Sequence, residues 1–289
     1  MTLEYDVIVK QILNGISLVL FLTLIAMGLS IIFGMMRIIN MAHGELFMLG
    51  AYTVYGVQSA GLNFWVGIVT APLVVVIIGL AMERSVLRYL YGRQDISTLL
   101  ATWGFGVIFR QGIQLVFGAD LKFVQAPAAL QGTLVFFGIA YPVYRLFAML
   151  MAALIILGVL ILFFKTNFGI MSRATIQNRE MSAVLGIDTQ RMFLLSFVLG
   201  SALAGISGAL MAPIISVIST MGLDFLARSF FAVIIGGMGS IFGVLGGGFI
   251  VGETESIFSI FFIPTVAQTI VLLMVIVVVL LMPKGLFKT

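Results

Sequence analysis

Few side chains of this chain could take part in chemistry, and the densest group of them interrupts an apolar region near the N-terminus. The segment Arg37–Glu45 holds two opposite charges, the amide of Asn40 and the only histidine, His43. Ionisable groups are costly at membrane depth and usually face a cavity or one another. We therefore expect Arg37 to pair with Glu45 across a broken turn. The segment is either a short turn in water or a discontinuous helix whose ends line a polar path for a solute.

Two other groups of residues could serve such a path. Thr98 and Thr102 are one helical turn apart, so they share a face and either bond their own backbone or line the path. Three nearby glycines stand where the chain could reverse its direction. The residues predicted to line or gate the path are therefore Asn40, His43, Glu45, Thr98, Thr102, Gly236, Gly237 and Gly239.

No constellation of catalytic residues is present in the sequence. The chain has no cysteine, which excludes disulfides, thiolate metal sites and thiol catalysis, and one histidine leaves no room for a histidine-based metal site. It also lacks a nucleophile elbow, an HExxH motif and a phosphate-binding GxxxxGK(S/T) loop. We expect no enzyme activity, no metal and no bound cofactor, so uphill transport would need an ion gradient or a separate ATPase.

The elements that position these residues must be membrane helices. Of the 289 residues, 62% are hydrophobic and 9% are charged, whereas a soluble domain has about 25% charged residues. In lipid, only helices or closed barrels satisfy every backbone hydrogen bond. The apolar runs are continuous rather than alternating, which excludes an outer-membrane barrel. The predicted fold class is all-α, a polytopic membrane helix bundle that forms a single domain over residues 1–289.

The apolar runs predict helices at residues 12–36, 45–60, 63–82, 96–117, 143–164, 191–213 and 264–282. The helix at 45–60 is short for a crossing, and we expect it to continue across the break at 37–44. A Gly-rich stretch, 227–258, is predicted to form a re-entrant hairpin or two short crossings. This predicts about eight crossings, or seven with a membrane-dipping loop.

Basic residues indicate how the chain is oriented. They are concentrated at Arg84, Arg88, Arg93, Lys165, Arg173, Arg179, Arg191, Lys284 and Lys288. Because cytoplasmic loops carry an excess of lysine and arginine, these segments are predicted to lie in the cytoplasm. By parity, the N-terminus and residues 118–142 are then outside, and the C-terminus is cytoplasmic.

The segment 165–191 is the longest polar break in the chain. Within it, Met181 and Leu185 are one helical turn apart, and Gly186 follows as a possible C-cap. These features predict a short amphipathic helix over 172–188 that lies across the inner face of the membrane. Its apolar side rests either on lipid headgroups or in a groove of a soluble partner.

Several charged residues elsewhere have spacings that suggest pairs. Asp224 and Arg228 are at i,i+4 spacing and are predicted to form a surface pair. Glu253 and Glu255 are expected to be an acidic pair at the outer edge. Arg110 lies inside an apolar helix, where it either extends to the interface or pairs with a partner that the sequence does not identify.

Small residues recur at four-residue spacing in two predicted helices. One series is Gly200, Ala204, Gly208 and Ala212, and the other is Gly239, Gly243 and Gly247. In lipid, such series let helix backbones approach closely. They either pack helices together or allow helices to slide against a partner.

Segments along nearly the whole chain, taken in order, resemble a known family. They are residues 40–45, 48–52, 173–174, 178–181, 185–187, 222–225 and 235–240, together with Gly243. This pattern is similar to the permease subunits of branched-chain (hydrophobic) amino acid ABC importers. The resemblance implies a bacterial inner-membrane location and three kinds of partner besides lipid: a second homologous permease, two cytoplasmic ATPase subunits that bind ATP and Mg, and a periplasmic substrate-binding protein. The net charge of +4 suggests no nucleic acid partner.

The resemblance also implies a role for the polar break. In this family, the loop corresponding to residues 172–188 contacts the ATPase. Coupling to the ATPase is therefore expected of Arg173, Gln177, Arg179, Glu180, Met181, Leu185 and Gly186.

Two segments point within the family. Residues 90–93 and 98–104 are similar to the urea and short-chain amide branch, whereas residues 95–97 depart from its pattern. The expected function is thus the permease subunit of an ABC importer for urea or short-chain amides. One alternative is the same machine importing branched-chain amino acids, and another is a stand-alone channel or secondary carrier.

Overall fold

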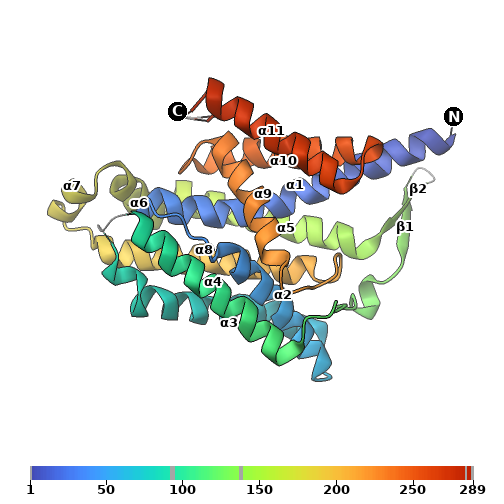
Figure 1. Ribbon diagram of the computed structural model, residues 1–289, viewed down its shortest axis with the longest axis horizontal. Coiled ribbons are helices and arrows are strands. Elements are labelled where there is room, and N and C mark those ends of the chain that lie inside the picture. The colour runs from blue at the N-terminus through green and yellow to red at the C-terminus, as the bar shows by residue number, and fades with distance from the viewer. Residues whose placement is uncertain (1, 92–94, 137–138, 284, 288–289) are drawn as a thin grey trace.

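The computed structural model describes residues 2–91, 95–136, 139–283 and 285–287 as an elongated bundle of helices (Figure 1). Among the described residues, seven helices are long and apolar enough to cross a membrane. This confirms the predicted all-α polytopic class. The α-helices are α1 (Thr2–Met36), α2 (His43–Ser59), α3 (Phe64–Ser85), α4 (Asp95–Phe117), α5 (Val143–Lys165), α6 (Asn167–Gln177), α7 (Arg179–Val184), α8 (Thr189–Met211), α9 (Met221–Gly236), α10 (Ile241–Phe261) and α11 (Pro264–Leu281).

The long helices run roughly along the long axis of the molecule, and α9 crosses them steeply (Figure 1). The N-terminus lies at one end, and α6 and α7 lie at the other. Two 3-10 turns, η1 (Leu87–Tyr89) and η2 (Ala128–Leu130), stand in the connections. Gly92 and Arg93, which belong to the urea-like segment, and Lys284 and Lys288 of the tail lie outside the described residues.

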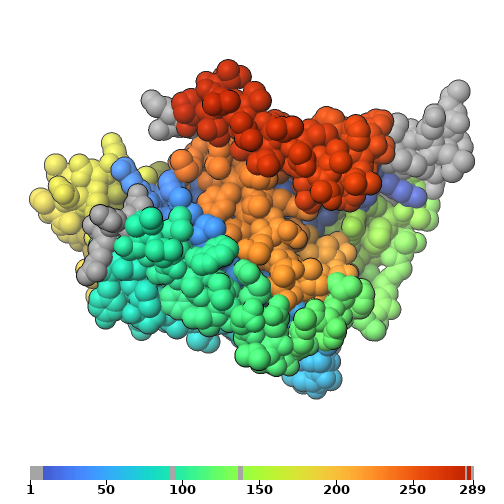
Figure 2. Space-filling model, in the orientation of Figure 1, coloured from blue at the N-terminus to red at the C-terminus, as the bar shows by residue number. Residues whose placement is uncertain are grey.

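Helices α1 and α8 form the centre of the bundle. The apolar window of α1 is 72% buried and that of α8 is 67% buried, whereas those of α4 and α11 are only 17% buried. In Figure 2, α4, α9 and α11 form most of the visible surface, and little of α1 reaches it. The outer helices therefore present apolar faces to lipid or to other chains, while α1 and α8 position the interior residues.

Glycine lets α1, α2 and α8 approach one another closely. A Cβ at Gly28 would lie 2.7 Å from the carbonyl oxygen of Gly200, and a Cβ at Gly50 would collide with the carbonyl group of Gly205. Gly208 meets the backbone of α2 in the same way. The first series of small residues therefore packs helix against helix, as interfaces between membrane helices do.

The stretch 227–258 is built differently from either predicted form. Helix α9 begins earlier, at Met221, and has 16 residues, whereas α10 has 21 residues and is long enough to cross the membrane. The reversal between them lies where it was expected, after Gly236. These helices are longer than predicted because the prediction relied on the low helix propensity of glycine. In a membrane this propensity matters less, since every backbone group must be hydrogen-bonded internally.

A small β-hairpin was not predicted from the sequence. Strand β1 (Thr133–Phe136) pairs antiparallel with β2 (Ile139–Pro142). The hairpin lies at the end of the molecule that holds the N-terminus (Figure 1). With four residues in each strand, it is too short to give a clear alternating pattern in sequence.

The close approach at Gly50 gives a test of the packing. Gly50→Ala should lower the thermal unfolding midpoint of the purified protein, because an added methyl group overpacks the contact with Gly205 at a cost of about 1–3 kcal/mol. Gly104→Ala is the matched control, since a Cβ at this helical glycine meets nothing within 4 Å. Equal midpoints for the two variants would contradict the packing role.

Candidate functional site

The polar segment after α1 is a true break in the helix. Helix α1 ends at Met36 and α2 begins at His43, so the expectation of one helix continuing through 37–44 was wrong. Arg37 adopts a left-handed conformation with φ 54°, which turns the chain. The Asn40 Oδ1 then accepts a hydrogen bond from the backbone N–H of Ala42 at 3.1 Å, a local bond that favours a turn over a helix.

Helix α4 holds the break from the side. The Thr102 hydroxyl accepts a hydrogen bond from the Met41 N–H at 3.1 Å and donates to the carbonyl of Leu99 at 3.0 Å. Thr98, one turn earlier on the same face, is also buried. Thr102 thus bonds its own backbone, which is the first alternative given for this residue, and it also bonds the break.

His43 anchors the start of α2 to the middle of α1. Its ring is fully buried, and Nε2 lies 3.0 Å from the carbonyl oxygen of Ile25. A carbonyl oxygen only accepts, so Nε2 carries the proton in this bond. The opposite ring nitrogen, Nδ1, has no hydrogen-bond partner among the described residues. A neutral His43 therefore keeps one free acceptor inside the bundle.

Glu45 pairs with Arg110 and not with Arg37. The Glu45 Oε1 lies 2.5 Å from Nη2 and 3.1 Å from Nε of Arg110, and Arg37 is exposed at the surface. The correction has a physical reason: Glu45 is 1% exposed and lies against α4, which carries Arg110, whereas Arg37 adopts a left-handed conformation and is exposed. Glu45 is therefore the partner of Arg110 that the sequence did not identify.

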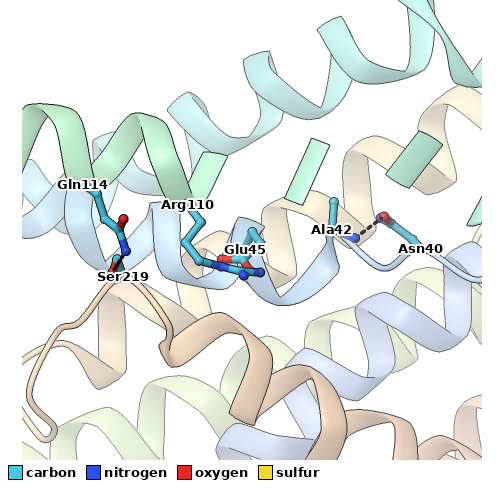
Figure 3. A network of polar contacts seen from close by, with 6 residues as sticks. All are labelled: Asn40, Ala42, Glu45, Arg110, Gln114 and Ser219. Atoms are coloured by element: carbon cyan, nitrogen blue, oxygen red, sulfur yellow. Dashed lines mark hydrogen bonds and ion pairs between the residues drawn. The ribbon is translucent and has the colours of Figure 1, made fainter. Parts of the chain in front are cut away.

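The contact surface between α4 and its neighbours continues one turn beyond Arg110. The Gln114 Nε2 donates to the Ser219 Oγ at 2.8 Å. Figure 3 shows Arg110 and Gln114 side by side on α4, one directed at Glu45 on α2 and the other at Ser219 in the α8–α9 connection. Neither Gln114 nor Ser219 was predicted from the sequence, although the i,i+4 spacing of Gln114 from Arg110 was a usable signal for that residue.

Four buried polar atoms on α2 and in the break before it lack a hydrogen-bond partner among the described residues. They are Asn40 Nδ2, His43 Nδ1, Glu45 Oε2 and Tyr52 Oη. We call these four atoms the α2 seam. They do not share one face, since His43 bonds to α1 and Glu45 bonds to α4. Buried polar groups are normally bonded, so each atom needs an explanation such as water.

The predicted reversal after α9 lies against the end of α1. Gly237 and Gly239 have φ of 99° and 84°, which L-residues with side chains rarely adopt. The Ser240 Oγ then accepts from the N–H of Gly243 at 3.0 Å and begins α10. A Cβ at Gly34 would lie 3.3 Å from the Cα of Gly239. The turn therefore touches α1 just before the break, though it does not reach the α2 seam.

The loop 165–191 forms two helices rather than the single predicted one. Helix α6 continues from the end of α5, and α7 begins after Asn178, whose side chain accepts from the N–H of Met181 at 3.0 Å. Arg173 turns back, donating to the carbonyl of Phe163. The N–H of Gly186 bonds the carbonyl of Ala183 just after α7 ends. With φ 86°, Gly186 has the conformation of a residue that terminates a helix.

The apolar face of α7 points away from the rest of the chain. Met181, Val184 and Leu185 are 56%, 82% and 74% exposed. Arg179 instead lies over the ring of Phe193 on α8, with 4.7 Å between its Cζ and the ring centroid. The short helix is therefore held on its polar side and leaves its apolar side uncovered.

A cavity of about 420 Å³ joins the break to the coupling segment. It is lined by Arg37, Thr98 and residues 175–180, which include Gln177, Arg179 and Glu180. The structure thus brings Thr98 together with three of the residues predicted to couple. Met181, Leu185 and Gly186 do not line this cavity.

A tyrosine ties the α3–α4 connection to the same end of the molecule. The Tyr91 hydroxyl donates to Glu83 Oε1 at 2.9 Å, and its ring packs on Phe193. Burial, together with the nearby carboxylate of Glu83, raises the pKa of Tyr91 above its usual range. The phenol therefore stays protonated and keeps donating this bond across the physiological pH range.

Two predicted charge arrangements near α9 and α10 were wrong. Arg228 pairs with Glu255, with 3.0 Å between Nη1 and Oε1, and not with Asp224. Glu255 is largely buried, so it does not form an exposed acidic pair with Glu253. The i,i+4 rule misled here because it considers one helix alone, whereas α9 and α10 pack side by side.

The chain is similar to several known proteins along most of its length. The family model described as "Branched-chain amino acid transport system / permease component" matches residues 11–280. The permease protein LivH of the high-affinity branched-chain amino acid transport system of Escherichia coli (strain K12) is 27% identical over 99% of this chain and 97% of its own length. BraD of Pseudomonas aeruginosa is 27% identical over 96% and 94%, and a probable LivH of Methanocaldococcus jannaschii is 27% identical over 86% and 80%.

A multi-pass helix bundle with polar groups along an interior helix is the architecture of a membrane transport protein. The extent of the family match makes the assignment specific. This chain belongs to the permease-component family of branched-chain amino acid transport systems. It is a transport subunit and not an enzyme.

The buried pair between α2 and α4 can be tested by a double-mutant cycle. Arg110→Met should destabilise the protein by about 3–5 kcal/mol, because it leaves the buried carboxylate of Glu45 without a partner. Adding Glu45→Gln should recover much of that loss. The measurement is the thermal unfolding midpoint of each purified variant.

The exposed pair between Arg191 and Asp188 is the control for this cycle, since its side chains are 82% and 51% exposed. Arg191→Met should leave the midpoint unchanged, because exposed pairs contribute little. If Arg110→Met behaved like Arg191→Met, the pair would not stabilise the fold.

Proposed function

We propose that this chain is the transmembrane permease subunit of an ABC importer for branched-chain amino acids. The observation that carries the proposal is the family match over residues 11–280. The α2 seam supports it, because a transport subunit needs polar groups inside an apolar bundle and these groups have no structural partner among the described residues. Asn40, His43 and Glu45 are the residues we assign to the translocation path.

The relatives favour an amino acid over urea as the substrate. LivH and BraD are named for branched-chain amino acid transport, which supports the alternative from the sequence analysis rather than the urea-like signal of residues 90–93 and 98–104. The charges point the same way. Urea is neutral and needs no counter-charge, whereas the Glu45–Arg110 pair offers both signs that a zwitterion requires.

The orientation follows from where the basic residues gather. Arg84 at the end of α3 and Arg88 in η1 line a cavity with Arg191 at the start of α8, so these basic residues gather at the end of the molecule that holds α6 and α7. By the positive-inside rule this end is cytoplasmic. The N-terminus and the β-hairpin then face the outside of the inner membrane (Figure 1).

Helix α7 is the proposed docking element for a cytoplasmic ATPase subunit. Its three exposed apolar residues, Met181, Val184 and Leu185, form a surface that would be costly in water and fits a groove on a partner. Movement of α7 would act on the cavity shared by Arg179 and Thr98, and so on the break between α1 and α2. A second permease subunit and a periplasmic binding protein would complete the importer.

Substrate competition tests the proposal. In liposomes that contain the whole importer, uptake of labelled leucine should depend on ATP, and unlabelled isoleucine and valine should reduce it. Urea at the same concentration should have no effect. Inhibition by urea but not by isoleucine would favour the amide alternative, and uptake by this chain alone without ATP would favour a stand-alone carrier.

Gly186 allows a sharp test of coupling. Gly186→Pro should leave assembly intact but lower ATP-driven leucine uptake by about tenfold, a usual size for a coupling free energy. Proline cannot adopt φ 86° and lacks the N–H that bonds Ala183, so the end of α7 must change shape. ATP hydrolysis and uptake should be measured on the same preparation.

Gly61→Pro is the matched control for Gly186→Pro. Gly61 also has positive φ, donates its N–H to a nearby carbonyl and has open space around it, but it lies in the α2–α3 connection. If both variants transported leucine equally well, α7 would not be the coupling element.

A further inference from the structure

We propose that a second cavity, at the end of the bundle opposite α6 and α7, binds an apolar amino acid in its zwitterionic form. This inference rests on the proposed function and adds a substrate site within the chain. The cavity measures about 380 Å³, within the range of small-molecule sites. Residues of α1, α5, α9 and α10 line it, and Pro264 at the start of α11 closes one edge. Figure 2 shows the face where α5, α9 and α11 border the deeper α1.

One side of the cavity carries a largely buried ion pair. The guanidinium of Arg228 lies 3.0 Å from the carboxylate of Glu255, and the two side chains are 20% and 10% exposed. The Cζ of Arg228 also lies 5.4 Å from the centroid of the Phe225 ring. Both charges are therefore fixed in direction. The guanidinium keeps further donors for a ligand, since its contact with Glu255 uses one nitrogen, whereas the Glu255 carboxylate also accepts from the side chain of Gln268.

A second guanidinium gives the cavity an excess of positive charge. Arg145 on α5 donates to the Asn14 Oδ1, which also accepts from the Tyr141 hydroxyl at 3.3 Å. Asn14 is neutral, so among the described residues that line the cavity Glu255 is the one carboxylate for two arginines. The missing negative charge is what the carboxylate of an amino acid would supply, and arginine binds that group well.

Glu255 provides the complementary position for the ammonium group. Other polar side chains of this wall are already engaged, because the Gln11 Nε2 donates to the Ser256 carbonyl at 2.6 Å and to the Ser259 Oγ at 2.7 Å. These bonds hold α1 against α10 and fix the wall beside Glu255. An ammonium group would thus meet the Glu255 carboxylate, which Arg228 and Gln268 also contact.

Apart from Ser17, the rest of the lining is apolar. Leu18, Phe21, Met211, Ile214 and Ile215 line the cavity. A branched aliphatic side chain would be removed from water against these residues, which favours binding by the apolar area buried. Urea would gain nothing from this wall, so the cavity discriminates between the two substrate classes. Its place at the proposed outer end puts it where a solute would enter from a binding protein.

Photo-crosslinking with a diazirine analogue of leucine tests the site. The probe is added to the complete importer in lipid nanodiscs, and labelled peptides are identified by mass spectrometry. Labelling should fall within residues 9–21 and 211–228, and excess leucine should abolish it. Glu255→Gln should reduce the labelling by about tenfold, as expected for loss of a buried charge partner. Asp224→Asn removes an exposed carboxylate one helical turn before Arg228 on α9, and it should leave the labelling unchanged.

A second variant covers the case in which Glu255→Gln fails to fold. Ile215→Trp fills the half-buried apolar wall without touching a charge, and it should block labelling while the importer still assembles. Labelling that falls elsewhere in the chain would overturn the proposal. So would labelling that survives in Ile215→Trp, or that is displaced by glycerophosphoethanolamine and not by leucine, since the site would then hold a lipid headgroup.

Leucine uptake by the unmodified importer separates this inference from the proposed function. If uptake is normal and the cavity is not labelled, the site is wrong and the function stands. If the importer moves urea and not leucine, the proposed function fails whatever the labelling shows.

Discussion

The break between α1 and α2 is the feature on which the rest of the structure depends. In a membrane, a helix that stops leaves backbone groups that lipid cannot satisfy. This chain bonds them with its own polar residues: Asn40 closes the turn, and Thr102 accepts from Met41. The break therefore needs a hydroxyl group on a neighbouring helix beside Met41, and Thr102 of α4 provides it. Once α4 is fixed in this way, Arg110 comes within reach of Glu45.

Close packing by glycine is the second constraint, and it explains why polar groups can sit so deep. The start of α2 lies directly against α9, since a Cβ at Gly44 would collide with Gly222. At the same crossing, a Cβ at Gly222 would lie 2.7 Å from Glu45 Oε2. No bulky side chain fits there, so the carboxylate is enclosed by backbone. The close packing of the α2 and α9 backbones, rather than hydrogen bonds of the polar atoms, thus holds the α2 seam in place.

The sequence predicted the helices well because their signals are local. Long apolar runs and the helix end at Gly186 follow from residue types within a few positions, although the interruption at Asn178 was not predicted. The pairs were not predictable in this way. Glu45 with Arg110 and Arg228 with Glu255 join residues far apart in sequence, and local spacing suggested Arg37 and Asp224 instead. The choice of partner depends on which helices are neighbours, and an apolar run does not encode that.

Helix α1 runs from one cavity to the other and lines both of them. Its first half lines the cavity beside Arg228 and Glu255 through Gln11 and Phe21, and its last residues line the cavity beside Arg37. Between them, the Ile25 carbonyl accepts the bond from His43, which is the start of the α2 seam. A shift of α1 must therefore change both cavities and the seam at once. Helix α1 is also the most buried of the long helices. Near its C-terminal end, Gly34 lies close to Ile176 of α6 and to Gly239 of the turn, so α1 is in packed contact with α6 at one end and lines the other cavity at its opposite end.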